Sequence, residues 1–152
     1  MIEIELSGPP RGKGRPRSRI INGFVSVYTD AATRAYELKL AWTAKAAMEG
    51  KPPFDCPLTV EIIAYIAIPD SWPKKKKLSA ESGEIVPGGP LDIDNICKAS
   101  LDGLNGVVWL DDKQIVGLTA WKIYSSEPRL TIRVEPWGQS NADQARAIGA
   151  GK

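Results

Sequence analysis

The chain has 152 residues and a formal net charge of +2, and 43% of its residues are hydrophobic, which is enough for one domain with its own core. It contains no histidine, which excludes a Ser-His-Asp or Cys-His triad and any zinc site with histidine ligands. Its two cysteines form no CxxC pattern, and its start does not resemble a signal peptide. No apolar run reaches the roughly 18 residues of a membrane helix. A cytoplasmic protein without a membrane partner is therefore expected.

The first third of the chain alternates between strand and helix patterns. Apolar and acidic side chains alternate over residues 2–6 and predict a half-buried strand, whereas the glycines and prolines of residues 7–19 predict an irregular loop. Residues 24–29 predict a short strand, after which Thr29 or Asp30 can cap a helix over residues 31–49. The expected apolar stripe of that helix consists of Ala31, Ala35, Leu38, Trp42 and Ala46.

The rest of the chain predicts further strands and a second helix. Residues 57–68 carry apolar side chains on both faces, which is typical of a central strand, and a long polar loop follows over residues 69–90. A helix is expected from Asp94 or Asn95 to about Gly106, then a brief strand at 107–110, a turn at 111–113, and strands at 114–124 and 130–137.

The sum of these elements predicts one domain over residues 1–137. Its expected fold class is α+β, with a mixed or antiparallel sheet of four to five strands packed against two main helices. Residues 138–152, rich in alanine, glycine and glutamine, are expected to form a flexible C-terminal tail.

Two aspartates stand close together in the segment “PLDIDNICK”, residues 90–98. If this segment is extended, the carboxylates of Asp92 and Asp94 point to the same side and repel each other. Lys98 stands one helical turn beyond Asp94, and Asp102 continues that line as its expected partner. Because aspartate is common in helix caps and lysine is common in i,i+4 pairs, these features alone also fit an ordinary helix entry.

A second acidic pair, Asp111 and Asp112 of “WLDDK”, is near enough in sequence to fold back beside that helix entry. A divalent cation such as Mg²⁺ prefers oxygen ligands, offsets repulsion between carboxylates, and can activate water for attack on a phosphodiester. A pair of aspartates in a turn is also a common structural feature. The residues by themselves therefore leave both a metal site and a set of caps and turns open.

Basic residues gather in two segments away from this acidic region. Five of them lie between residues 11 and 19, and four consecutive lysines occupy residues 74–77. Segregated charge of this kind favours a polyanionic partner held beside a separate acidic centre, although a solvated loop and a solubility-promoting turn would look the same.

The segment “LDIDNICKASLDGLNGVVWLDDKQIVGL”, residues 91–118, resembles the core of the RusA-like Holliday junction resolvases, which carry D-x-D-N-x-x-K at a helix entry followed by W-x-D-D. The segments “GPPRGKGRPR”, “YTDAATRAYE” and “SWPKKKK” resemble the same family in the same order, so the resemblance covers most of residues 1–136. The chain departs from many members in having “GGPL” where a basic residue and proline precede the first aspartate. Its spacing between helix and WLDD is also a residue shorter than in some members.

The resemblance implies a Mg²⁺-dependent endonuclease, with Mn²⁺ as a substitute, that cuts two symmetric strands of a four-way DNA junction as a homodimer. It assigns the metal to Asp92, Asp94 and Asp112, with Asp111 as a possible further ligand. The four residues that it implies to be catalytic are Asp92, Asp94, Lys98 and Asp112. The residues expected to contact DNA are Arg11, Lys13, Arg15, Arg17, Lys74, Lys75, Lys76 and Lys77.

Two other functions remain open at this point. One is a branched-DNA-binding protein that does not cleave, and the other is a metal-dependent phosphohydrolase of small nucleotides. The low net charge fits a nucleotide hydrolase, whereas two separate basic segments fit a larger polyanion better. The resemblance is compatible with a protein encoded by a bacterium or by a phage.

Overall fold

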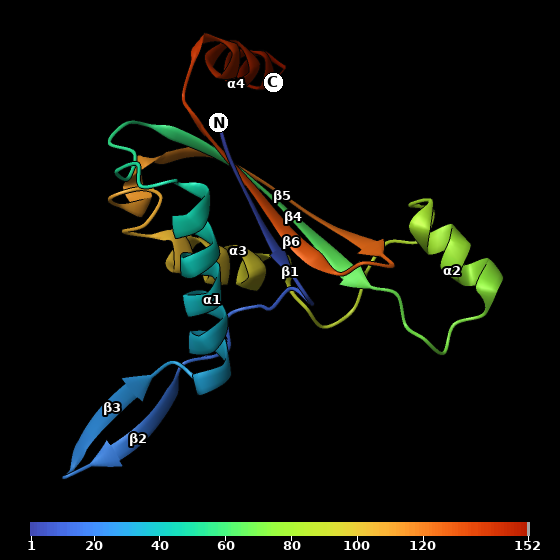
Figure 1. Ribbon diagram of the computed structural model, residues 1–152, viewed down its shortest axis with the longest axis horizontal. Helices are drawn as coiled ribbons and strands as arrows, with labels where there is room; N and C mark the ends of the chain where they lie inside the picture. The colour runs from blue at the N-terminus through green and yellow to red at the C-terminus, as the bar shows by residue number, and fades with distance from the viewer. Residues whose placement is uncertain (152) are drawn as a thin grey trace.

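A four-stranded sheet forms the centre of the protein (Figure 1). The computed structural model describes residues 1–151, apart from the side chain of Gln139. The order across the sheet is β1-β6-β4-β5. β4 is antiparallel to β6 and parallel to β5, and β1 is antiparallel to β6. The strands are β1 Ile2–Ser7, β4 Leu58–Ala67, β5 Ile115–Ser125 and β6 Arg129–Pro136. The predicted α+β class and the central position of β4 are confirmed.

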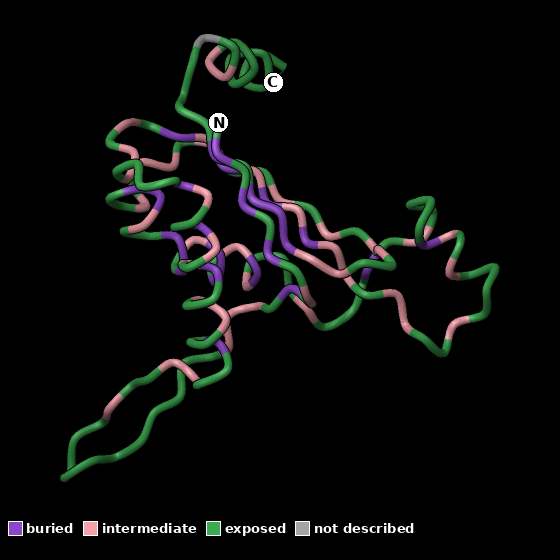
Figure 2. Tube along the Cα trace, in the orientation of Figure 1, coloured by how far each residue is buried: buried purple, intermediate pink, exposed green. Residues whose placement is uncertain are grey.

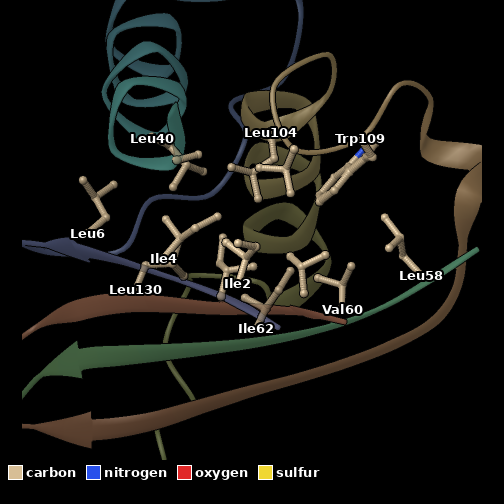
Figure 3. Close-up of a cluster of buried hydrophobic side chains, with 14 of the residues drawn as sticks. Ile2, Ile4, Leu6, Leu40, Leu58, Val60, Ile62, Leu104, Trp109 and Leu130 are labelled. Carbon is tan, nitrogen blue, oxygen red and sulfur yellow. The ribbon is translucent and has the colours of Figure 1, made fainter. Parts of the chain in front are cut away.

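Two helices, α1 Ala31–Ala47 and α3 Ile93–Leu104, lie over one face of this sheet and enclose the core (Figure 3). Alternate side chains of β4, such as Val60 and Ile62, are buried beneath the helices. α1 and α3 approach each other closely at Gly103, where an added Cβ atom would lie 3.2 Å from the carbonyl oxygen of Glu37. A larger residue at this position would therefore push the two helices apart.

The buried face of α1 differs from the predicted stripe. Leu38 and Trp42, which were expected to be buried, are 56% and 70% exposed. The buried apolar side chains are instead Leu40 and Ala44, with Met48 just beyond the helix. The prediction was wrong because alanines occur on several sides of this helix, and their small side chains do not distinguish the face that packs against β1 and α3.

A hairpin projects from the domain. Its second strand confirms the strand predicted at residues 24–29, whereas its first strand begins within the predicted irregular loop. The hairpin consists of β2 Arg17–Ile21 and β3 Phe24–Tyr28, which pair with each other in a separate two-stranded sheet. Figure 2 shows that it is exposed along almost its whole length. Asn22 and Gly23 connect the strands with φ angles of 50° and 80°, which is the backbone that an Asn-Gly hairpin turn requires. The nearby prolines obscured this signal in the sequence.

Several helix boundaries also differ from the predictions. α2 Lys74–Glu81 lies within the segment predicted to be a polar loop, and α4 Gln139–Ala150 lies where a tail without regular structure was predicted. α3 begins earlier than predicted, with Asp92 as its N-cap. The predicted brief strand at 107–110 forms only isolated bridges at Trp109, and the short 3₁₀ helix η1 Asp112–Gln114 follows.

No helix in the described part of the chain is long and apolar enough to cross a membrane.

Asp30 caps the N-terminus of α1, as predicted. Its carboxylate accepts hydrogen bonds from the hydroxyl and the backbone N–H of Thr33, at 2.5 and 3.1 Å. These two bonds hold the pKa of Asp30 below its ordinary value, and the bond from the Thr33 hydroxyl has the larger effect. The Thr33 hydroxyl also accepts from the backbone N–H of Gly14 at 3.3 Å, so the cap ties the basic loop to the helix.

We expect Asp30→Ala to lower the urea concentration at the unfolding midpoint near neutral pH, because α1 loses its capping acceptor. A carboxylate with a lowered folded-state pKa stabilises the fold above its unfolded-state pKa, and this contribution is lost as pH falls through the folded-state value. The difference between wild type and variant should therefore shrink in acid. Asp70→Ala, a change at an exposed loop aspartate, is the matched control. An undiminished difference in acid would contradict the assigned role.

Candidate active site

Three of the predicted site residues lie together at the N-terminal end of α3. Asp92 is the N-cap, but its side chain makes no capping hydrogen bond. Asp94 lies in the first turn, and its carboxylate is 3.4 Å from the ammonium group of Lys98. All three side chains are exposed, so two carboxylates and one cation face solvent at a helix end whose N–H groups favour anions.

Asp112 is held by a buried tryptophan. The indole N–H of Trp109 donates to one carboxylate oxygen of Asp112 at 2.7 Å, while the Trp109 side chain is fully buried in the core (Figure 3). The other carboxylate oxygen makes no hydrogen bond within the described part of the chain. The core therefore fixes the position of Asp112 and leaves one oxygen for another ligand.

The turn around Asp112 is built by side-chain hydrogen bonds. Asp111 caps η1 by accepting from the backbone N–H of Lys113 at 2.9 Å, and this bond is the main cause that lowers the pKa of Asp111. The Gln114 amide donates to the carbonyl oxygens of Phe54 and Cys56 at 2.8 and 3.0 Å. The bonds of Gln114 anchor the turn to the segment that precedes β4. The cap on η1 gives Asp111 a structural role.

The acidic pair at the start of α3 and the turn with Asp112 lie at opposite ends of β5. The ammonium group of Lys122, in the distal half of β5, donates to the carbonyl oxygen of Leu91 at 2.8 Å, directly before Asp92. Asp112 instead lies just before Ile115, the first residue of β5. The path from Ile115 to Lys122 is about 23 Å in an extended strand.

The prediction that Asp111 and Asp112 fold back beside the helix entry is therefore wrong for a single chain. Among the described residues, no three histidine, cysteine, aspartate or glutamate side chains gather closely enough to hold a metal ion. The structure brings together Asp92, Asp94 and Lys98, and it holds Asp112 elsewhere.

Lys13 has a different neighbourhood from the one predicted. Its ammonium group pairs with Asp102 and lies 3.3 Å from a carboxylate oxygen of Glu37. The hydrogen bond to Asp102 is the main cause that raises the pKa of Lys13. The backbone N–H of Lys13 also donates to the carbonyl oxygen of Asn95 at 2.8 Å. Lys13 thus fixes the basic loop against α1 and α3, and Asp102 pairs with it rather than with Lys98.

The other basic residues of this loop and its hairpin remain exposed. Arg11 lies 3.6 Å from Asp30, and Arg15 and Arg17 continue along the chain into β2. Arg19, which was not among the predicted contacts, lies on the same face of the hairpin as Arg17, with its guanidinium 5.4 Å from the ring centre of Tyr28. Arg15, Arg17 and Arg19 are two residues apart, a spacing that is typical of a strand. This spacing is the sequence signal that could have identified Arg19 as a further member of the basic set.

The four lysines at residues 74–77 occupy the start of α2. The ammonium group of Lys76 lies 3.8 Å from the ring centre of Trp72, and that ring packs edge-on against Tyr124 at 5.3 Å. These contacts attach the lysine helix to the distal end of β5, which is also the end where α3 begins. One basic segment therefore lies on the side of the domain that carries Asp92 and Asp94.

This chain is similar to a known protein family and to a known bacterial protein. The family model described as endodeoxyribonuclease RusA matches residues 7–135. The uncharacterized protein YqaN of Bacillus subtilis (strain 168) is 33% identical over 137 residues, and the match covers 88% of this chain and 94% of that protein. The family match spans both acidic segments and both basic segments.

We expect Trp109→Phe to lower the free energy of unfolding by about 1–3 kcal/mol, because it removes the donor to the Asp112 carboxylate and retains a buried aromatic ring. Trp42→Phe changes an exposed tryptophan of α1 and should shift the same quantity by less than about 0.5 kcal/mol. Guanidinium unfolding followed by circular dichroism measures both. Equal effects of the two substitutions would show that the Trp109 hydrogen bond contributes nothing.

Proposed function

The chain belongs to the RusA endodeoxyribonuclease family, and on this basis we propose that it resolves four-way DNA junctions by Mg²⁺-dependent hydrolysis of paired phosphodiester bonds. The observation that supports the proposal most directly is the exposed group of Asp92, Asp94 and Lys98 at one end of α3, within the matched region. Exposure of all three charged groups suits a large substrate better than a small nucleotide, which an enclosed pocket would bind.

The acidic pair at the start of α3 has the chemistry that Mg²⁺ requires. Asp92 makes no capping hydrogen bond, Asp94 pairs with Lys98 at 3.4 Å, and both aspartates are exposed, so carboxylate oxygens are accessible at both residues. Mg²⁺ in proteins commonly uses one or two carboxylates, together with water and substrate phosphate. We therefore assign the metal to Asp92 and Asp94 in each chain, where it would supply charge neutralisation and an activated water.

Lys98 is the residue that we assign to the scissile phosphate. Its ammonium group lies one turn above Asp94, on the same side of α3. Asp94 therefore holds this cation close to the acidic pair, where it can donate to a non-bridging phosphate oxygen or position the attacking water. Negative charge that builds on the phosphate during attack would then meet a fixed positive partner.

The exposed basic segments are assigned to the DNA backbone. Arg15, Arg17 and Arg19 follow one another at two-residue spacing, and the hairpin that carries the last two contains no acidic residue. The lysines of α2 lie on the side of the entry to α3. Phosphates attract such residues whatever the base sequence, so branched shape rather than sequence would select the substrate.

Asp94→Asn should lower the rate of Mg²⁺-dependent nicking of a labelled four-way junction by at least about 100-fold, and Lys98→Ala by about 100-fold, because each removes a charged group from the reaction centre. Glu127→Gln, an exposed change in the turn between β5 and β6, should leave the rate unchanged. Parallel reactions with EDTA and with matched linear duplex complete the assay. Metal-independent cutting would refute the metal assignment, and equal cutting of duplex would refute junction selectivity.

The double variant Arg15→Ala, Arg17→Ala should bind the junction more weakly and reduce the slope of log K against log salt concentration by about 2, because each arginine releases about one counterion. Lys51→Ala, which removes an exposed lysine at the far end of α1, should change neither quantity. Fluorescence anisotropy over a range of salt concentrations measures the slope. An unchanged slope would place these arginines outside the DNA contact.

A further inference from the structure

The far end of the β2–β3 hairpin exposes four large apolar side chains on either side of its Asn-Gly turn. They are between 42% and 78% exposed, and we call them the apolar tip: Ile20, Ile21, Phe24 and Val25. The two strands pair with each other in a sheet separate from the central one. Apolar surface gathered at the end of a projecting element marks a place where another molecule binds.

The register of the hairpin places the apolar tip on both of its faces. Ile21 and Phe24 are cross-strand partners on one face, and Ile20 and Val25 are partners on the opposite face. A protein surface laid against one face would leave the other face in water. A narrow slot between two flat apolar groups covers both faces at once, and stacked base pairs form such a slot when they separate.

Charge is distributed along the hairpin in the order that DNA requires. Arg17 and Arg19 lie on the same face as Phe24 but nearer to the domain. Residues 6–29 contain no acidic side chain. Phosphates on the outside of DNA attract the arginines, whereas the flat faces of the bases, inside, suit apolar and aromatic side chains. Proteins that bend DNA combine the same two features, since they insert apolar wedges between base steps.

The base of the hairpin is fastened beside the acidic pair at the start of α3. The backbone N–H of Lys13 donates to the carbonyl oxygen of Asn95 at 2.8 Å, in the first turn of α3. An added Cβ atom at Gly12 would lie 3.0 Å from the Cβ atom of Asn95. The other strand leads into Asp30, which caps α1. The hairpin therefore projects from a fixed origin near the candidate active site, beyond the N-terminal end of α1 (Figure 1).

A branch point is a favourable place for such a wedge. In a linear duplex, insertion must separate two stacked base pairs, which costs stacking free energy. The base pairs that border a branch point lack a continuous neighbour on both strands, so less stacking is lost there. An apolar wedge therefore prefers branched DNA, whereas contacts between arginine and phosphate do not distinguish a junction from a duplex.

We propose that the apolar tip inserts between the base pairs at the branch point of a four-way junction, while Arg17 and Arg19 contact the adjoining phosphates. This role rests on the proposed function, because it explains how the proposed substrate is selected. The arginines supply affinity for any DNA, and the tip recognises the branch. The bond from Lys13 to α3 holds the hairpin at a fixed place relative to the acidic pair.

Threonine at the tip tests the insertion. The double variant Ile21→Thr, Phe24→Thr keeps β-branched side chains that suit a strand and removes most of the apolar surface of one face. We expect it to bind a four-way junction about 10-fold more weakly, while its affinity for a linear duplex changes by less than about 2-fold because the arginines remain. Fluorescence anisotropy in EDTA measures both dissociation constants without cleavage.

Two further variants are the controls. Val27→Thr changes an exposed apolar residue of the hairpin outside the tip and should leave both affinities unchanged. The double variant Ile21→Leu, Phe24→Leu retains an apolar wedge and should retain the preference for junctions. Circular dichroism during urea unfolding verifies that each variant is folded. Equal weakening on junction and duplex by the threonine variant, or an equally large loss in the leucine variant, would overturn the insertion.

A fluorescent base locates the tip on the DNA. 2-Aminopurine, whose emission rises when it loses a stacked neighbour, is placed either beside the branch point or in the middle of one arm. Wild-type protein should raise the emission at the branch point and not in the arm. The threonine variant, at a saturating concentration, should abolish most of this rise. A rise of undiminished size would contradict insertion by the tip.

Failure of the insertion and failure of the proposed function give different results. A wild-type protein that prefers junctions in EDTA but does not nick them with Mg²⁺ would refute the proposed function and support the role of the tip. A threonine variant that binds and nicks junctions as selectively as wild type would refute the insertion alone. If that variant instead changes the sedimentation coefficient of the free protein, the tip belongs to a protein interface, and insertion into DNA is overturned.

Discussion

The parallel pairing of β4 with β5 is the constraint on which the rest of the structure depends. Because the two strands run in the same direction, the chain that connects them must return along the sheet, and α3 makes that return. Its entry with Asp92 therefore lies at one end of β5, and the turn with Asp112 lies at the other. The separation of the acidic residues follows from topology and not from a loop that could rearrange.

Side-chain bonds hold each part of the site at its end of the sheet. Lys122 fixes the entry to α3, Trp109 fixes Asp112, and Lys13 ties the basic loop to α3 through Asp102. Each bond joins a framework residue to a site element and leaves Asp92 and Asp94 exposed. The rigid parts of the protein thus position charges at its surface, as an enzyme acting on a large polyanion requires.

Secondary structure was predictable where one local signal dominated. The apolar run of β4 and the cap at Asp30 identified a central strand and the start of a helix. The buried face of α1 was not predictable from its alanines, and β2, which pairs with the predicted strand β3, was hidden by neighbouring glycines and prolines. These features depend on what packs nearby, and that information is not local to the segment.

The sequence by itself determined the chemistry of this protein: the absence of histidine, the aspartates and lysine at a helix entry, the second acidic pair, and the basic segments. Residue type and short spacing suffice for those statements because charge and capping act over a few residues. Tertiary structure alone decided that Lys13 serves the framework, that Trp109 orients Asp112, and that Asp112 lies far from Asp92. Strand direction sets such distances, because it determines which ends of distant segments meet.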